Sequence, residues 1–117
     1  MQAITRVPQA PAHVRGVHNL RGAILPVLEV RTRLGLSPAT LSPSSRIVVA
    51  ESRSKRIGLL VDGVHQVIRI PESSLEPPPA EVKSRLSEHV VGMVPAHERL
   101  ALLLSLDKLL FLPELAS

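Results

Sequence analysis

Short aliphatic segments separated by prolines are the feature that most constrains the fold of this chain. Of its 117 residues 11 are proline, and the 44% that are hydrophobic are nearly all aliphatic, with one phenylalanine and neither tryptophan nor tyrosine. β-Branched side chains favour strands, whereas proline removes a ladder hydrogen bond and ends them. The composition therefore predicts many short strands joined by turns around an aliphatic core.

The apolar segments are spaced as about seven short strands, which favours a β-barrel or sandwich. A loop at 37–45, rich in serine and proline, divides them into two strand groups at about 1–36 and 46–112. Two small barrels, or one split barrel, fit this division. The predicted strands lie at 13–21, 23–30, 46–52, 56–62, 64–70, 90–96 and 100–106, with a further short strand expected at 4–7 and single helical turns at 31–36 and 107–112, the latter capped by Asp107.

The length predicts a single domain spanning 1–117, because a domain usually contains roughly 100–200 residues. The N-terminal sequence lacks the charged and apolar regions of a signal peptide. The longest apolar stretch, at 100–112, is interrupted by Asp107 and Lys108 and is shorter than the roughly 20 residues that span a bilayer. We therefore expect a cytoplasmic protein.

Residues that carry chemistry do not form a catalytic or metal-binding pattern. The chain has no cysteine, which excludes disulfides, thiolate zinc sites and cysteine nucleophiles. Its five histidines show no metal-ligand spacing, and neither a nucleophile elbow nor a phosphate-binding loop occurs. We expect no enzymatic activity, no catalytic residue, no metal and no cofactor.

The formal net charge of +4 is compatible with nucleic acid, anionic lipid or an acidic protein as a partner. Proteins that bind single strands stack bases on aromatic side chains, each worth about 1–3 kcal/mol. The one aromatic residue, Phe111, lies in an aliphatic C-terminal segment. A basic β-barrel that binds nucleic acid is therefore the weaker alternative to a protein-binding module.

Three segments carry motifs in a fixed order. The first is VRGVHNLRGAILPVLEVRTRLGL at 14–36, with a G-V-x-N-L-R-G turn and a Pro-Val strand. The second is RIGLLVDGVHQVIRIPESSLEPPP at 56–79, with a Val-Asp strand pair and a proline-containing loop. The third is VVGMVPAHERLALLLSLDKLL at 90–110, with a closing hairpin and an L-D-x-x-L-L end. Together they resemble the CheW-like domain of bacterial chemotaxis over nearly the whole chain, with Glu29-Val30-Arg31 in place of the usual D-L-R.

The resemblance implies an all-β fold of two small SH3-like β-barrel subdomains around a shared aliphatic core. Family members begin with two strands before the segment that matches 4–7, so the first barrel is expected to be incomplete at its N-terminus. An incomplete barrel would have an unpaired edge near 4–7 and 23–30. Exposed edges pair with other chains, and self-association is therefore expected.

The resemblance also implies a function. CheW-like proteins are adaptors that couple transmembrane chemoreceptors to the histidine kinase CheA without catalysing a reaction. The implied partners are the cytoplasmic tip of a chemoreceptor and the regulatory domain of CheA, at membrane-bound receptor arrays. A CheW-like scaffold of a pilus-motility or other chemosensory pathway is the alternative within the family.

Three positions match the family's receptor contacts: Gly16, Arg21 and Val67. Backbone geometry is the competing explanation for Gly16, since glycine adopts conformations that other residues avoid, and core packing is the competing explanation for Val67. Four further residues are expected to shape the turn or the strand bend, namely Asn19, Gly22, Asp62 and Gly63.

Overall fold

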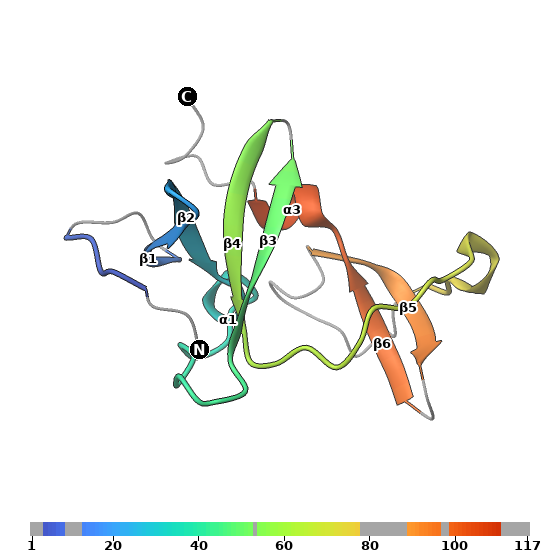
Figure 1. Cartoon of the computed structure of the whole chain (residues 1–117). Helices are drawn as coiled ribbons and strands as arrows, with labels where there is room; N and C mark the ends of the chain where they lie inside the picture. Colours follow the sequence, from blue (N-terminus) through green and yellow to red (C-terminus); the bar gives the residue numbers. More distant parts are fainter. Residues whose placement is uncertain (1–3, 9–12, 53, 78–88, 97–98, 111–117) are drawn as a thin grey trace.

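The computed structural model describes residues 4–8, 13–52, 54–77, 89–96 and 99–110 (Figure 1). The strands of this part of the chain form two separate sheets, which confirms the predicted all-β fold class. The larger sheet, with the order β1-β2-β4-β3, contains β1 (Val14–Leu20), β2 (Ala23–Glu29), β3 (Arg46–Ser52) and β4 (Lys55–Val61); the smaller pairs β5 (Val90–Ala96) with β6 (Arg99–Leu104). The short helical segments are α1 (Val30–Arg33), the 3-10 turn η1 (Glu72–Ser74) and α3 (Leu106–Leu110).

Parallel pairing between β2 and β4 joins the two hairpins of the larger sheet. The β1–β2 and β3–β4 pairs are antiparallel hairpins, and residues 27–29 of the first pair with residues 58–60 of the second. A parallel pair needs a crossover connection, which here contains α1 and the loop at 37–45. The sheets consequently divide the chain after β4, whereas the sequence suggested two strand groups separated at that loop.

The strand predicted at 64–70 is wrong. After a bend at Asp62 this segment has no regular secondary structure and belongs to neither sheet. Both edges of β4 are already paired, with β2 and β3, so the chain leaves the sheet instead of adding to it. The alternating pattern of the segment does not reveal that a neighbouring strand is missing.

The unpaired edge expected at 23–30 is also wrong, because β2 pairs with β1 on one side and β4 on the other. At the β1 edge, Thr5 and Val17 exchange two backbone hydrogen bonds of 2.8 Å, so the strand expected at 4–7 is reduced to a single bridge. β3 is the other edge strand of the larger sheet. Self-association through the first barrel stays a prediction, without the open edge at 23–30 that was expected to cause it.

The cap predicted for the last helical turn is displaced by two residues. α3 begins at Leu106, and the Ser105 hydroxyl accepts a hydrogen bond of 3.3 Å from the Lys108 amide. This is the usual geometry of a serine N-cap, which satisfies an amide in the first helical turn. Asp107 lies inside that turn instead, where its charge favours the helix N-terminus.

The β1–β2 and β5–β6 hairpins are built alike at a constant spacing of 76 positions, a repeat that the sequence analysis missed. Each hairpin has a register shift before a glycine near its start and is followed by a short helix. Equivalent contacts are the strand pairs Val14–Leu28 and Val90–Leu104, and the hydrogen bonds from Glu29 N to His13 O (2.7 Å) and from Ser105 N to His89 O (2.8 Å). The two subdomains therefore share one hairpin-and-helix unit.

The aliphatic core lies on both faces of the larger sheet, since successive strand residues point to opposite faces. One buried cluster contains Leu28, Ile57 and Leu59, and the other contains Val27, Ala39 and Leu60. Leu110, on the helix that follows the smaller sheet, packs against the first cluster. Burying a leucine or isoleucine side chain contributes about 1.5–3 kcal/mol, so these clusters are a major source of stability.

Arg33 connects α1 to α3. Its Nε donates to the carbonyl of Leu109 at 3.0 Å, and its Nη2 donates to the carbonyl of Lys108 at 2.8 Å. Carbonyls at a helix C-terminus have no partner within the helix and carry partial negative charge. The guanidinium satisfies two of them, and it thereby holds the helix that follows the smaller sheet against the larger one.

In both hairpins an extended segment crosses a strand at a glycine. A Cβ on Gly16 would collide with the backbone oxygen of Thr5, and one on Gly92 would lie 2.6 Å from the backbone oxygen of Glu76. These oxygens also accept the bridging hydrogen bonds, so neither segment can move away without losing them. Close backbone approach therefore requires glycine at both positions.

We expect Gly16→Ala to destabilise the protein by about 1–3 kcal/mol, the usual cost of overpacking, because the new methyl group displaces Thr5. The matched control is Gly63→Ala, since a Cβ there would meet only the Ser44 carbonyl, at 3.6 Å. Its effect should stay within about 0.5 kcal/mol. Urea unfolding measures both, and equal effects of the two substitutions would contradict the assignment.

Candidate functional site

The turn between β1 and β2 presents Arg21 at the tip of a tight hairpin. Leu20 pairs with Ala23, and the two residues between them have positive φ angles, 51° at Arg21 and 87° at Gly22. Positive φ at both central positions defines the type I′ turn that suits the twist of a hairpin. The Asn19 side-chain oxygen accepts a hydrogen bond of 3.0 Å from the Gly22 amide and braces the turn.

Arg21 is an unusual residue for this backbone conformation, which asparagine and glycine adopt more readily. Its side chain is exposed, and it makes no hydrogen bond or ion pair within the part of the chain that the structure describes. Neither core packing nor an internal contact accounts for an arginine here. The guanidinium is thus available to a partner.

The same end of the larger sheet carries further positive charge. Because β2 and β4 are parallel neighbours, the β1–β2 turn lies at the end where β4 begins, with Lys55 and Arg56. Arg56 forms an exposed ion pair of 3.3 Å with Glu51, which offsets one charge. An exposed cluster with net positive charge at a sheet end favours an acidic partner surface.

Val67 lies in a different place from Arg21. It follows the end of β4, whereas Arg21 is near the start of β4, and a seven-residue strand is about 20 Å long. The Val67 side chain is 94% exposed, so the core explanation for it is wrong. Val64 and Ile68 are also exposed, at 53% and 43%, and the three residues give the segment 63–70 an apolar surface.

Gly16, the third position matched to receptor contacts, is buried beneath residues 4 and 5. Its geometry supports the backbone explanation given above, since a side chain cannot be accommodated there. The structure therefore does not bring Gly16, Arg21 and Val67 together into one patch. Arg21 and Val67 occupy two separate exposed surfaces.

Asp62, expected to shape the strand bend, forms an ion pair that joins two of the sequence motifs. Its carboxylate accepts a hydrogen bond of 2.9 Å from Nη1 of Arg31, whose Nε donates to the Ser37 carbonyl at 2.7 Å. Arg31 thus connects the bend after β4 to the loop at 37–45. Next to it, a Cβ on Gly63 would meet only ordinary contacts, so space does not require glycine there.

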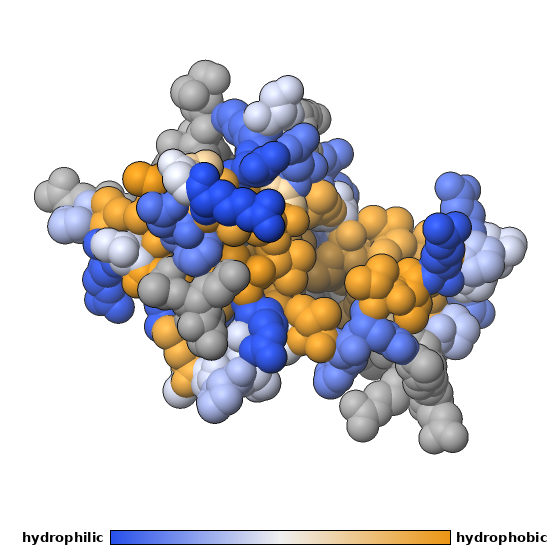
Figure 2. All heavy atoms as spheres, viewed as in Figure 1, coloured by the Kyte–Doolittle hydropathy of each residue, from blue (hydrophilic) through white to orange (hydrophobic). Residues whose placement is uncertain are grey.

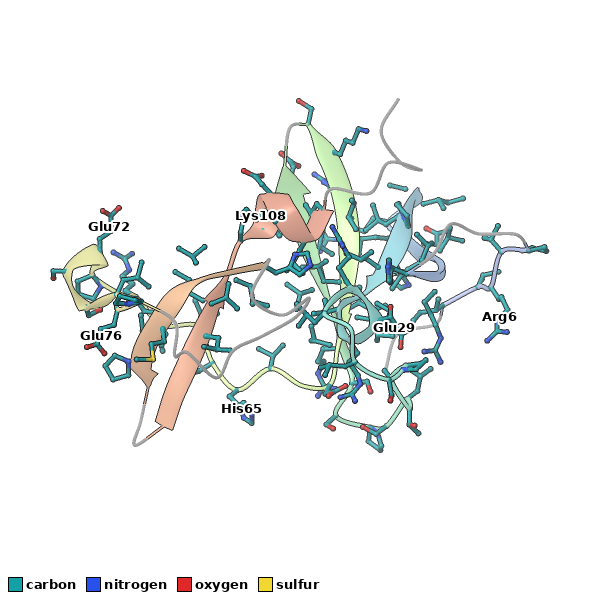
Figure 3. All side chains as sticks on the ribbon, turned by 180° about the vertical axis from the view of Figure 1, so that it is seen from behind. Arg6, Glu29, His65, Glu72, Glu76 and Lys108 are labelled. Carbon is teal, nitrogen blue, oxygen red and sulfur yellow. The ribbon has the colours of Figure 1, made fainter. Side chains whose placement is uncertain are left out.

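A buried polar cluster around Glu29 was missed by the sequence analysis. The side chain of Glu29, labelled in Figure 3, is buried. Its carboxylate accepts a hydrogen bond from the Ala39 amide and pairs with Nη1 of Arg15 at 3.3 Å. Thr32 continues the cluster by bonding to the Glu29 carbonyl at 3.2 Å and to the His13 ring at 3.0 Å. The signal in the sequence was a carboxylate at the end of an otherwise aliphatic strand, a position that requires a buried partner.

The residues that the structure describes contain no group of three side chains arranged to hold a metal ion. Among these residues, no helix combines the length and the apolar character needed to cross a bilayer. What the arrangement offers to a partner is surface: a basic hairpin tip and an exposed apolar segment, both held by the larger sheet.

Comparison with known proteins identifies relatives over nearly the whole chain. The family model for the CheW-like domain matches residues 1–113. A probable chemotaxis protein CheW of Rhizobium etli is 37% identical over 106 residues, covering 90% of this chain and 68% of the relative. Chemotaxis protein CheW of Thermotoga maritima is 36% identical over 107 residues (92% and 69%), and protein FrzA of Myxococcus xanthus is 33% identical over 109 residues (92% and 68%).

A solved structure is similar in fold as well. The crystal structure of the scaffolding protein TtCheW from Thermoanaerobacter tengcongensis superposes with a TM-score of 0.80 at 35% identity, covering 96% of this chain and 76% of that one. The sequence relatives are longer too: this chain spans 68% of the Rhizobium etli protein. The similarity therefore extends over almost all of this chain and over about two thirds of the curated relatives.

The Glu29 cluster gives a stability prediction. Glu29→Ala should destabilise the protein by about 3 kcal/mol, because it leaves the Arg15 charge without its buried partner. Asp62→Ala is the matched control: it also removes a carboxylate from an arginine, but the Asp62 side chain is 64% exposed against 7% for Glu29. Its cost should stay below about 1 kcal/mol. Chemical denaturation tests the pair, and a larger loss for Asp62→Ala would contradict the described burial.

Proposed function

The chain belongs to the CheW-like domain family, and on this premise we propose that it is a non-catalytic adaptor that couples chemoreceptors to the histidine kinase CheA. The family match over residues 1–113 is the observation that carries the proposal. We propose a cytoplasmic location with recruitment to membrane-bound receptor arrays. The adaptor would act by holding two proteins near each other, so its chemistry is that of recognition.

The cytoplasmic tip of a chemoreceptor is the partner we assign to the Arg21 turn. Arginine is enriched among the residues that dominate binding energy at protein interfaces. Arg21 is exposed and occupies a backbone conformation that favours smaller residues, which supports a role in binding rather than in the turn itself. Its neighbours at this end of the sheet add positive charge, and so an acidic or polar receptor surface is the complement.

The exposed segment 63–70 is the second contact surface in this proposal. Val67 lies beyond the opposite end of β4 from Arg21, so one adaptor can hold different surfaces of a partner, or two partners, at once. The Val67 position matches the family's receptor contacts, so we propose that the receptor binds here as well as at Arg21, and the regulatory domain of CheA is the second partner we propose. The apolar character of Val64, Val67 and Ile68 suits burial at an interface, where aliphatic side chains leave water.

A scaffold of another chemosensory pathway is the alternative within the family. The relatives include protein FrzA of Myxococcus xanthus, whose name differs from that of the chemotaxis proteins CheW. The same surfaces would serve there with a different receptor. Binding to receptor tips and kinases from each pathway, measured with the purified chain, decides between them.

A nucleic-acid role is the alternative outside the family. It predicts DNA binding whose affinity falls steeply with salt, since phosphate contacts release counterions. The adaptor function predicts capture of a receptor tip or of CheA instead. A DNA titration at two salt concentrations and a pull-down with receptor fragments separate the two functions.

Replacement of Arg21 tests the receptor contact. We expect Arg21→Asn to weaken binding to a soluble receptor tip, measured with CheA present, by about 2 kcal/mol or more if Arg21 dominates the interface. Asparagine accepts positive φ, so the free energy of unfolding should change by less than about 0.5 kcal/mol. Arg21→Glu should weaken binding further, because it adds repulsion to the lost contact.

Two outcomes of this experiment would count against the contact. Unchanged binding in both variants would remove Arg21 from the interface. A loss of binding accompanied by a collapse of the melting transition would make Arg21 a structural residue. A matched control is Lys108→Gln, which removes one exposed positive charge on α3, outside both proposed contact surfaces, and should leave receptor binding unchanged.

A further inference from the structure

A cavity of about 440 Å³ lies between the N-terminal segment, the start of β1 and the end of β2, away from the Arg21 turn. It is large enough for a small ligand or for a side chain of a partner, since ligand sites usually begin near 300 Å³. Its lining residues are Arg6, Val7, Pro8, His13, Val14, Arg15, Glu29 and Thr32. Figure 3 shows Arg6 on the N-terminal segment at one side of the molecule and Glu29 nearer its interior.

Arg15 has donors without a partner among the residues that the structure describes. Only its Nη1 makes hydrogen bonds, one to the Glu29 carboxylate at 3.3 Å and one to the Ala39 carbonyl at 3.2 Å. Within the described residues, its Nε and Nη2 have no partner, although the side chain is only 24% exposed. A guanidinium carries five N–H donors in a fixed fork, and these two nitrogens are not among the fully buried polar atoms of the described residues, so they are accessible to a ligand.

Arg6 brings a second guanidinium to the same cavity. Its side chain is exposed and has no ion pair or hydrogen bond within the described part of the chain. The bridge between Thr5 and Val17 fixes the neighbouring backbone against β1, so Arg6 is held beside the cavity. Two arginines and one carboxylate, that of Glu29, leave a net charge of about +1 around the space.

We propose that this cavity binds a carboxylate group, held by the unused donors of Arg15 and by Arg6. Arginine binds carboxylates through two parallel N–H···O bonds, which are stronger than neutral hydrogen bonds. A single negative charge matches the net charge of the lining. The carboxylate has two candidate sources, a free small organic acid or an acidic side chain of a partner protein.

Titration of the purified chain with sodium acetate and with a blocked tetraglutamate peptide tests this site. Sodium chloride keeps the ionic strength constant, so that nonspecific screening does not contribute. We expect saturable changes in the NMR signals of the Arg6 and Arg15 Nε–H groups. Saturation by acetate at a concentration similar to that of the peptide identifies a site for free acids, whereas saturation by the peptide alone identifies a site for a partner's side chain.

Arg6→Gln is the variant that tests the geometry, because Arg6 is exposed and its loss should not affect folding. We expect it to weaken carboxylate binding about tenfold. Arg69→Gln, which removes another exposed arginine of the same charge outside the cavity, should leave the affinity unchanged. Equal effects of the two substitutions would overturn the site, since both would then act only through net charge.

Two further results would also overturn the proposal. The first is linear, non-saturating signal changes with both probes, which would show that the cavity holds no carboxylate. The second is much tighter binding of inorganic phosphate than of acetate or the peptide, which would assign the two arginines to phosphate instead. The test does not involve Arg21 or a receptor fragment, and so its failure would leave the proposed adaptor function unaffected.

Discussion

The arrangement of the larger sheet depends on the parallel pairing of β2 with β4. This pairing places the two hairpins of the larger sheet side by side and lets both core clusters form on its faces. At Gly58 of β4, a Cβ would lie 2.8 Å from Cγ2 of Ile47 on the other neighbouring strand, β3, and 3.6 Å from Cγ2 of Val27 on β2. Without the pairing, the basic turn and the segment 63–70 would have no common support.

The smaller sheet repeats part of this design and is attached to the larger one through α3. Leu110 enters the first core cluster, and Arg33 bonds to the carbonyls of α3. Figure 2 shows apolar residues gathered across the middle of the molecule, between the larger sheet and the β5–β6 hairpin, where the surface is hollowed. The two buried core clusters themselves lie on the larger sheet, with Leu110 of α3 packed against the first, so the core expected to be shared belongs mainly to the larger sheet.

The hairpins could be predicted from the sequence because the turn residues and the flanking strands that define them are neighbours in the chain. The turn at 19–22 combines asparagine and glycine with the geometry that each requires, and strand alternation marks the residues on either side.

The prediction of a strand at 64–70 failed because alternation describes one segment alone, whereas strand pairing depends on which strand edges remain free. Glu29 and its partner Ala39 are ten residues apart across a crossover, and no local pattern reveals such a contact. The repeat at 76 positions was visible as Val-x-Gly at 14–16 and at 90–92, but two short matches gain meaning only from the strand register.

The central claim is that a rigid sheet presents the β1–β2 turn to a receptor without changing its own structure. The most direct measurement is the change in backbone amide NMR signals of the labelled chain when a soluble chemoreceptor tip is added. The account predicts large changes at residues 20–22 and almost none at Glu29 or Gly58, which lie within the sheet. Changes spread through the core strands with none at the turn would contradict it.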